Sequence, residues 1–315
     1  ENHEDDRDLT AKLYIGGPEL RLKQEWILGV GGVRVLRALG VDPAAWHANE
    51  GHAAFMMVER VRELTVKGVP FDDASRQVRA RSVFTTHTPV PAGHDTFTFA
   101  DLAQCSGDIW TDLGVSRETF FEIGTHPTEE PGRFHMTVAA LRLSKHVNAV
   151  SKRHGDVSRQ IWAPLWPDRE ATQVPIGHIT NGVHAQTWMA REVADLLDTN
   201  LGTDWIARMT ESAMWEAVRD IDDAAFWRVH VKLKVALMNF IREEARRRWV
   251  RHWKEATHVV GAGTLLNPDV LTIGFARRFA PYKRAVHNFR DIDRLRALLV
   301  NTARPVQIIF AGKAH

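Results

Sequence analysis

Cysteine, excess charge of one sign and long apolar runs are all scarce in this sequence, and each scarcity excludes a class of protein. The single cysteine, Cys105, rules out an internal disulfide and fits a reducing compartment, so we expect a cytoplasmic protein. A formal net charge of +2 gives no general attraction to nucleic acid or to a membrane surface. No apolar run approaches the roughly 18 residues that a membrane-spanning helix needs, and the acidic start ENHEDDRDL is unlike a signal peptide.

The remaining composition is that of a globular protein with room for two domains. Apolar residues make up 44% of the 315 residues and charged residues 25%. The sequence begins with Glu1 rather than Met, and it stops soon after the strand-like run Val306–Ala311. A strand that ends a chain in this way lacks its crossover connection. We therefore expect a fragment of a longer polypeptide.

Short apolar runs alternate with amphipathic helical stretches, which predicts the α/β class with a mainly parallel sheet. The expected strands are Val83–Thr86, Val147–Val150, Ile176–Thr180, Leu271–Ala276 and Val306–Ala311. The expected helices are Leu20–Leu39, Ala53–Leu64, Phe134–His146 and a long one from about Asp223 to Lys254. An Asn-Gly turn signal at Asn181 indicates a domain boundary there.

The most informative segment is LTIGFARRFAPYKRA, Leu271–Ala285, in which an apolar strand leads into four cations. We expect a helix to begin at these cations, and a helix N-terminus favours anions through its free N–H groups and its dipole. Arginine can grip a phosphate through two parallel hydrogen bonds. The segment therefore predicts a phosphate site, with a solvated basic turn as the alternative.

Two further strand ends carry side chains that suit a sugar. His87 follows the strand in SVFTTHTPVPAGHD, although a lone histidine in such a place is often structural. Asn181 follows the strand in HITNGVH, and its amide can donate and accept hydrogen bonds to sugar hydroxyls. The alternative for Asn181 is a turn without a ligand. Because ligands bind at the carboxyl ends of strands in open α/β sheets, both could face one crevice.

Three other patterns suggest functions that we reject. His47 and His52 lie five residues apart, so they do not share a helix face as the zinc ligands of H-E-x-x-H do. The run Gly29–Gly32 matches a dinucleotide fingerprint poorly and lies within helix-like apolar spacing. The basic run Arg242–Lys254 ends a predicted helix, where cations stabilise the C-terminus, so RNA binding is a distant alternative.

Taken together, these segments resemble the α-glucan (glycogen and maltodextrin) phosphorylases, in particular their shorter bacterial branch. The matching stretches, in order, are ELRLKQE (Glu19–Glu25), NEGHAAF (Asn49–Phe55), THTPVPAGHD (Thr86–Asp95), ITNGV (Ile179–Val183), ARRFAPYKR (Ala276–Arg284) and IIFAGKAH (Ile308–His315). They span nearly the whole chain, and an ordered set of six is far more specific than any one of them.

The resemblance implies a GT-B-like fold, which consists of two Rossmann-like domains, both incomplete in this fragment. Residues 1–183 would be the C-terminal part of the N-terminal, glucan-binding domain, and residues 184–315 the first part of the C-terminal, cofactor- and phosphate-binding domain. The family is a retaining glycosyltransferase that uses pyridoxal 5′-phosphate and orthophosphate to release glucose 1-phosphate from an α-1,4-glucan. We expect no nucleic-acid or membrane partner, and the oligomeric state stays open.

The resemblance also assigns roles to residues of this sequence. His87 would lie beside the reacting glucose, Arg278 and Lys283 would bind the substrate phosphate, and Arg277 would bind the phosphate of the cofactor. The residues assigned to substrate binding are Asn49, Glu50, His52, His87, Asn181 and Tyr282. Glu50 replaces an aspartate found in many members of the family.

The residues fit those roles chemically. Breaking a glycosidic bond develops positive charge on the sugar, which a fixed phosphate dianion can stabilise. No carboxylate pair of the kind that glycosidases use stands at the expected positions, so the cofactor would supply proton transfer. The lysine that attaches the cofactor is expected beyond His315 and a glycine-rich loop before Glu1, so the fragment alone should be inactive. The alternatives are a GT-B glucan synthase that uses a sugar nucleotide and a non-catalytic glucan-binding fragment.

Overall fold

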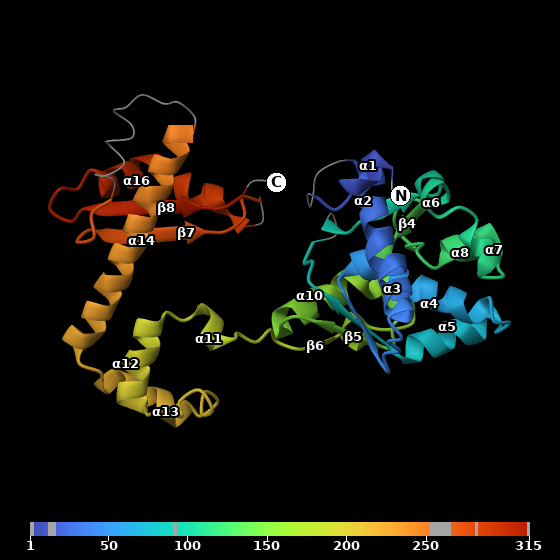
Figure 1. The fold of residues 1–315 in the computed structure, drawn as a ribbon, viewed down its shortest axis with the longest axis horizontal. Helices are drawn as coiled ribbons and strands as arrows, with labels where there is room; N and C mark the ends of the chain where they lie inside the picture. The colour runs from blue at the N-terminus through green and yellow to red at the C-terminus, as the bar shows by residue number, and fades with distance from the viewer. Residues whose placement is uncertain (1–2, 12–16, 91–92, 252–265, 281–282, 314–315) are drawn as a thin grey trace. The chain divides into compact units, whose positions relative to one another are not determined.

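The computed structural model describes residues 3–11, 17–90, 93–251, 266–280 and 283–313. The chain divides into two compact units, Glu1–Gly182 and Val183–His315, and each is described by itself below (Figure 1). The domain roles expected from the sequence stay a prediction. None of the helices in the described ranges combines the length and the apolar character that crossing a membrane requires.

The first unit is built on a parallel sheet with the strand order β1-β2-β5-β6. These strands are β1 (Trp46–Asn49), β2 (Ser82–Thr86), β5 (His146–Ala149) and β6 (Gly177–His178). Each neighbouring pair runs parallel. The predicted α/β class with a mainly parallel sheet is therefore confirmed. All four strands end at the same edge, which we call the carboxyl edge, and it is there that polar loops gather.

Helices connect and cover these strands, as a parallel sheet requires. They are α1 (Glu4–Arg7), α2 (Pro18–Trp26), α3 (Gly32–Ala38), α4 (Phe55–Thr65), α5 (Phe71–Ala80), α6 (Phe99–Ser106), α7 (Ile109–Asp112), α8 (Arg117–Glu122), α9 (Met136–Arg142) and α10 (Lys152–Trp162). A short antiparallel pair, β3 (Thr96–Thr98) and β4 (Arg133–His135), lies apart from the main sheet.

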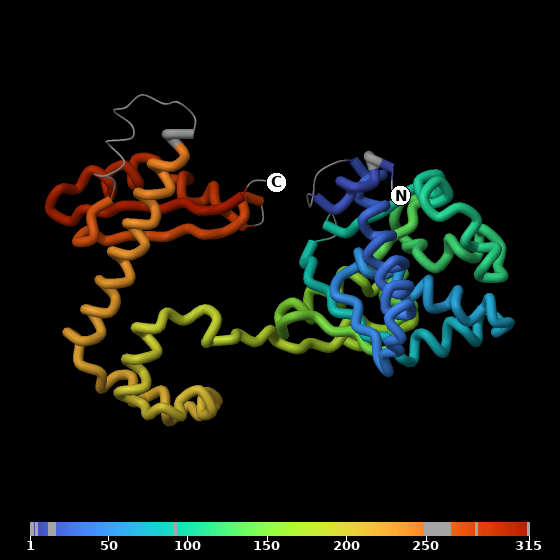
Figure 2. The backbone as a smooth tube through the Cα atoms, in the orientation of Figure 1, coloured from blue at the N-terminus to red at the C-terminus, as the bar shows by residue number. Residues whose placement is uncertain are grey.

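The helical stretch predicted over Leu20–Leu39 is present as one continuous run (Figure 2). A π-helical segment, η1 (Ile27–Gly31), joins α2 to α3. Gly29 lies in this segment, and a Cβ atom added to it would come within 2.6 Å of the Cβ of Phe55 in α4. The glycine-rich run therefore serves close packing of two helical segments, which agrees with rejecting it as a dinucleotide loop.

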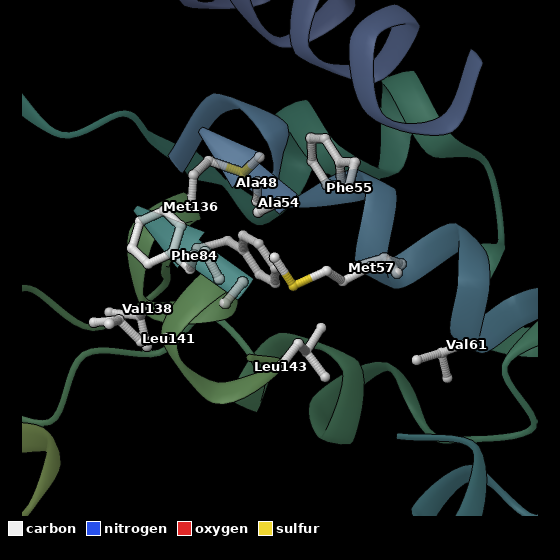
Figure 3. Packing of buried hydrophobic residues seen from close by; sticks show 14 of the residues in the cluster. Ala48, Ala54, Phe55, Met57, Val61, Phe84, Met136, Val138, Leu141 and Leu143 are labelled. Atoms are coloured by element: carbon white, nitrogen blue, oxygen red, sulfur yellow. The ribbon is translucent and has the colours of Figure 1, made fainter. Parts of the chain in front are cut away.

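The core of the first unit fills the space between the sheet and its helices. Phe55 and Met57 of α4 and Phe84 of β2 are fully buried, and they pack with Met136 of α9 (Figure 3). Burying one such side chain contributes about 1.5–3 kcal/mol. The apolar side of α4 thus holds the start of that helix, and the loop before it, against strand β2.

The second unit contains a helical part and a two-stranded parallel sheet. The helices are α11 (Ala185–Trp188), α12 (Arg191–Leu201), α13 (Ser212–Glu216), the long α14 (Asp223–Arg251) and α16 (Ile292–Leu299). Leu197, Trp205 and Met214 form a small core of their own. Strands β7 (Leu271–Ala276) and β8 (Val306–Ala311) pair in parallel and coincide with the predicted runs.

Three local predictions need correction. The helix expected over Phe134–His146 spans only Met136–Arg142, because Phe134 pairs with Phe97 across the β3–β4 ribbon and His146 begins β5. Strand β6 is shorter than the run Ile176–Thr180 that predicted it. Strand β1 was not expected at all. The long helix is described as far as Arg251, and the rest of its predicted range lies outside the described residues.

Candidate functional site

The carboxyl edge of the first unit is organised around the side chain of Glu50. This residue directly follows β1, and its backbone has φ 74° and ψ 163°, which is unusual for a residue with a side chain. One carboxylate oxygen, Oε2, accepts hydrogen bonds from the backbone N–H of His87 at 2.7 Å and from Thr88 Oγ1 at 2.8 Å. The other, Oε1, accepts from the N–H of Gly51 at 3.0 Å.

These bonds join the loop after β1 to the loop after β2. The backbone N–H of Glu50 also donates to the carbonyl of Thr85 at 2.9 Å, which prolongs the pairing of the two strands. Hydrogen bonds to an ionised carboxylate are among the stronger ones in proteins. We call Glu50, His87 and Thr88 the Glu50 clamp. It fixes where the backbone of His87 lies, and His87 was predicted to lie beside the reacting sugar.

His52 lies close to this clamp, at the start of the helical turn before α4. It is half-buried, and burial lowers the pKa of its imidazole, with the positive charge of Arg21 acting in the same direction. The ring is therefore mainly neutral at neutral pH. A neutral imidazole has one donor and one acceptor nitrogen, which suits hydroxyl groups. Asn49, the last residue of β1, is exposed at the same edge.

A partly buried charged cluster supports this edge, and it was not expected from the sequence. Arg21 of α2 donates to Asp95 Oδ2 from Nη2 at 2.9 Å and from Nε at 3.2 Å. Its Nε also lies 2.8 Å from Glu25 Oε1, one turn further along the helix. The members of the cluster lie in the motifs ELRLKQE and THTPVPAGHD, which the sequence analysis had singled out. Nothing in the sequence indicated that these two motifs contact each other.

The two carboxyl groups of the cluster have opposite pKa shifts. Burial is the main reason that the pKa of Glu25 is raised to about 9, and a hydrogen bond with Asp95 adds to it. The pKa of Asp95 is lowered, because hydrogen bonds from Glu25 and Arg21 outweigh its own burial. We infer that Glu25 is protonated at neutral pH, and that Asp95 is ionised and forms an ion pair with Arg21.

Three imidazoles pack around Trp162 behind the Thr86–Asp95 loop. The ring centroids of His94 and His135 lie 4.9 and 5.3 Å from that of Trp162, and the centroid of His126 lies 5.9 Å away. Burial lowers the pKa of all three, that of His135 to about 3. Neutral rings pack here as an uncharged layer beneath the loop that carries His87.

Asn181 follows β6, and its backbone N–H donates to the carbonyl of Val150 at 3.0 Å. The bond ties the loop after β6 to the end of the neighbouring strand β5. The side chain of Asn181 is exposed. Asn181 and the Glu50 clamp therefore belong to the same edge of the same sheet, as their positions at strand ends predicted.

The predicted phosphate-binding residues lie in the second unit, after β7. The backbone N–H of Arg277 donates to the carbonyl of Ala311, and that of Phe279 donates to the carbonyl of Lys313, both at 3.0 Å. The loop thus continues the pairing of β7 with β8. A Cβ atom on Gly312 would lie 2.1 Å from the carbonyl oxygen of Arg277, so only glycine fits beside it. Arg277 and Arg278 are exposed and Lys283 is half-buried.

The prediction that a helix begins at these cations is wrong. A short 3-10 turn, η9 (Ala285–Phe289), follows them, and Arg284 before it adopts a left-handed backbone with φ 62°. The α-helix starts only at Ile292, where the side chain of Asp291 accepts a hydrogen bond from the N–H of Arg294 at 2.9 Å. Asp is a favoured N-cap, whereas an arginine side chain has no acceptor. The predicted attraction of this loop for an anion would therefore come from its side chains and not from a helix N-terminus.

Tyr282, the remaining predicted sugar contact, lies outside the described residues. Within the part of the chain that the structure describes, no three His, Cys, Asp or Glu side chains are grouped so as to hold a metal ion. His47 instead shares a hydrogen bond of 2.7 Å with Thr85 Oγ1 of the neighbouring strand.

The first unit is a parallel α/β unit with polar strand-end loops, and the second has a strand that leads into a basic loop. In open α/β sheets, ligands tend to bind at such strand ends. Known sequences narrow the class of protein. The whole chain is 38% identical to the glycogen phosphorylase of Aquifex aeolicus and 38% identical to the maltodextrin phosphorylase of Thermococcus litoralis. It is 39% identical to the glycogen phosphorylase of Mycobacterium tuberculosis over 327 aligned residues. No family model matches the chain.

The chain is therefore a relative of the glycogen and maltodextrin phosphorylases along its whole length, as its motifs predicted. It covers 45% of the Aquifex protein and 37% of each of the other two. The chain thus spans less than half the length of these relatives.

Proposed function

We propose that the chain serves an α-glucan phosphorylase, which transfers a glucosyl unit from the end of an α-1,4-glucan to orthophosphate and releases glucose 1-phosphate. The observation that carries the proposal is the identity to three phosphorylases over the complete chain. The placement of the predicted residues at strand ends supports it. Such an enzyme would be a glycosyltransferase of carbohydrate metabolism. A cytoplasmic location would agree with the single cysteine, Cys105.

The first unit would contribute the sugar side of the reaction. His87 would contact the reacting glucose, and the Glu50 clamp would keep its backbone in place through the 2.7 Å bond to its N–H. Asn181 and Asn49 would hold sugar hydroxyls, together with the neutral ring of His52. Holding a substrate in the correct position can provide a large part of the reduction in activation free energy that an enzyme achieves. In this proposal the unit works by binding and orientation, since its described carboxylates at this edge are held by backbone groups or by Arg21.

The second unit would contribute the phosphate side. Arg278 and Lys283 would hold the substrate dianion, whose negative charge stabilises positive charge developing on the sugar. Both belong to a loop that its bonds to Ala311 and Lys313 tie to β8. Cations fixed on a stiff loop need not reorganise when charge develops, and this makes them effective. Tyr282 would reach the 2-hydroxyl of the same sugar.

A cofactor completes the proposal. The described residues fit pyridoxal 5′-phosphate in one respect, because Arg277 is an exposed cation directly after strand β7 and could bind the cofactor's phosphate. When bound, that phosphate would supply the proton transfer, because the sequence has no glycosidase-type carboxylate pair at the expected positions. The residues of this chain would then bind, orient and shield the reactants.

The test is the phosphate dependence of the whole enzyme with Lys283→Met, compared with Lys145→Met, an exposed lysine of the first unit. Losing one charge-assisted contact should raise the phosphate concentration for half-maximal phosphorolysis about tenfold or more. The control should behave as wild type. An enzyme that extends glucan only from ADP-glucose, or whose phosphate dependence is the same in both variants, would contradict the proposal.

A further inference from the structure

A cavity of about 450 Å³ opens at the amino edge of the main sheet, opposite the edge that carries the Glu50 clamp. It lies where β1 and β2 begin, at Trp46 and next to Ser82, and where helices α3, α4 and α5 end. The volume is within the range of small-molecule sites. Four cations line it, Arg37, Arg60, Lys67 and Arg81, together with two carboxylates, Asp42 and Glu63.

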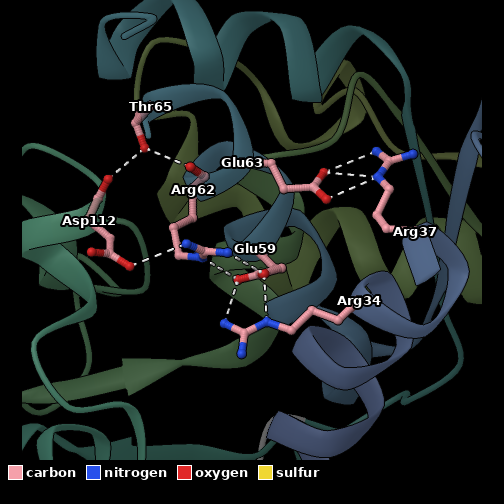
Figure 4. A network of polar contacts seen from close by, with 7 residues as sticks. All are labelled: Arg34, Arg37, Glu59, Arg62, Glu63, Thr65 and Asp112. Atoms are coloured by element: carbon pink, nitrogen blue, oxygen red, sulfur yellow. Dashed lines mark hydrogen bonds and ion pairs between the residues drawn. The ribbon is translucent and has the colours of Figure 1, made fainter. Parts of the chain in front are cut away.

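The two carboxylates are already engaged by one of the four cations. Arg37 donates to Glu63 Oε1 from Nε at 3.0 Å and to Glu63 Oε2 from Nη2 at 3.0 Å (Figure 4). Its Nη1 donates to Asp42 Oδ1 at 2.5 Å. The charge left for the cavity is therefore positive. The other arginines of α3 and α4 also have a carboxylate partner, since Arg34 and Arg62 both pair with Glu59.

Arg60 is the exception. Only 5% of it is exposed, and its Nη1 donates to the neutral Oγ of Ser82 at 2.8 Å. Its guanidinium lies 4.8 Å from the ring centroid of Trp46. Among the described residues, no carboxylate pairs with it. Burial, and after it the charges of Arg37 and Arg81, lower its pKa to about 10. The charges of Glu63 and Asp42 act in the opposite direction but do not offset this lowering. A buried guanidinium without a paired carboxylate is costly, so an anion that reaches it would be held firmly.

Capping of the helix ends does not account for these cations. The last carbonyls of α4 accept from backbone amides, Leu64 from Val69 and Thr65 from Gly68. The end of α3 is closed in the same way, with the N–H of Val41 donating to Leu36. Helix ends are partly negative, which repels an anion, but each such effect is small beside a full buried charge. Arg60, Lys67 and Arg81 are thus not needed to cap these helices.

We propose that this cavity binds an anion of the phosphate class, either free phosphate or a phosphate monoester, with Arg60 and Arg81 holding its charge. Arg60 would supply donors from within the cavity, and Arg81, which is exposed, would close on the anion from outside. Guanidinium groups match phosphate oxygens in geometry as well as in charge. The volume leaves space beside a phosphate group for a small organic part. The site is separate from the one in which the proposed function places its substrate phosphate.

Calorimetric titration with inorganic phosphate tests the proposal. Because Arg278 and Lys283 are proposed to bind phosphate too, every titration uses the chain with Arg278→Met and Lys283→Met. In this background we expect one phosphate to bind, and Arg60→Gln and Arg81→Gln each to weaken it at least about tenfold. Arg76→Gln is the matched control, since Arg76 is an exposed arginine of α5 that does not line the cavity.

Glycerol 3-phosphate and glycerol distinguish the two sources of the anion. Tighter binding of glycerol 3-phosphate than of phosphate identifies a monoester site, and the reverse identifies a site for free phosphate. Glycerol, which has no charge, should not bind. The proposal is overturned if phosphate does not bind at millimolar concentration, or if all three arginine variants bind it equally. Arg81→Gln decides the matter alone if Arg60→Gln does not fold.

Discussion

At the scale of single residues, Glu50 shows how one carboxylate can organise a site without reacting. Its left-handed backbone turns the side chain toward the next strand end, where it accepts from the N–H of His87 and from Thr88. The sequence placed Glu50 and His87 near the same sugar only through the family resemblance, because strand β1, which Glu50 follows, was not expected. It could not indicate the direction of the carboxylate, because this depends on a backbone angle that glutamate rarely adopts.

We predict that Glu50→Gln loosens this clamp. The amide group keeps the shape of the side chain but replaces one acceptor oxygen with a donor, so the N–H of either His87 or Gly51 loses its acceptor. The loss of the negative charge also weakens the hydrogen bonds that remain. Unfolding by urea should show a loss of about 1–2 kcal/mol, and the amide of His87 should exchange its hydrogen faster. Glu130→Gln, at an exposed position of the same unit, is the control. An unchanged exchange rate at His87 would show that the clamp does not hold this loop.

A second residue-scale prediction concerns the proton on Glu25. Its folded pKa of about 9 lies above its ordinary value of 4.5, so the folded state binds the proton more tightly than the unfolded state. The resulting stability is complete below about pH 4.5 and is lost as the pH rises toward 9. Glu25→Gln keeps a neutral group in place and should remove this slope, which amounts to as much as about 1 kcal/mol per pH unit.

Urea unfolding at pH 6, 7 and 8 checks the Glu25 prediction. Glu19→Gln is the control, because Glu19 is an exposed carboxylate of the same helix and is paired with Lys23. The wild type and the control should lose stability relative to Glu25→Gln as the pH rises. Parallel curves for all three proteins would mean that Glu25 is ionised in the folded chain.

At the scale of elements, the sequence predicted the helices and strands that can be recognised from their own residues alone. Strands β7 and β8 are largely apolar runs next to polar loops, and both were predicted correctly. Strand β1 was missed because only four residues form it, and two of them, His47 and Asn49, are polar and exposed. The start of the helix after β7 was predicted too early in the chain. The prediction relied on the cations, which favour an anion site, and did not consider which residue could cap a helix. The cap is Asp291, seven residues beyond Arg284.

Gly29 allows an element-scale prediction. In a helix, Gly→Ala normally stabilises by roughly 0.5–1 kcal/mol. At Gly29 the new Cβ would lie 2.6 Å from the Cβ of Phe55 and 2.7 Å from the backbone nitrogen of Met56. The helical segments must then separate, so Gly29→Ala should destabilise by about 1–3 kcal/mol.

Gly32→Ala is the matched control for Gly29→Ala, since Gly32 lies three residues along the same helical run and a Cβ there meets nothing within 4 Å. It should be neutral or mildly stabilising. Thermal or urea unfolding of the two variants measures the difference. Two equal changes would show that η1 does not pack against α4 as closely as described.

At the scale of the whole molecule, long-range pairings explain what sequence reasoning could not reach. Arg21 and Asp95 are 74 residues apart, and no spacing rule connects them. The candidate sugar side was partly predictable, because parallel strands bring their ends to one edge regardless of the connections between them. The cavity at the opposite edge was not predictable, because it arises from the ends of three helices and two strands.

The whole-molecule prediction concerns acid. Burial lowers the pKa of His94, His126 and His135, that of His135 to about 3. Unfolded histidine titrates near pH 6.5, so the unfolded chain binds more protons than the folded chain below that pH. Stability should therefore fall as the pH decreases from about 6.5 toward 3. The lowered pKa of Asp95 acts in the same direction at lower pH.

His135→Gln isolates the main contributor to this acid sensitivity, because the amide side chain does not titrate and can still form hydrogen bonds in the space left by the imidazole. We expect its unfolding free energy to fall less than that of the wild type between pH 7 and pH 5, by up to about 1 kcal/mol per pH unit. His178→Gln, an exposed histidine of β6, should follow the wild type. If His135→Gln loses stability with acid as steeply as the wild type, then burial does not lower the pKa of the His135 imidazole in the folded chain. The neutral imidazoles around Trp162 would then not explain the acid sensitivity.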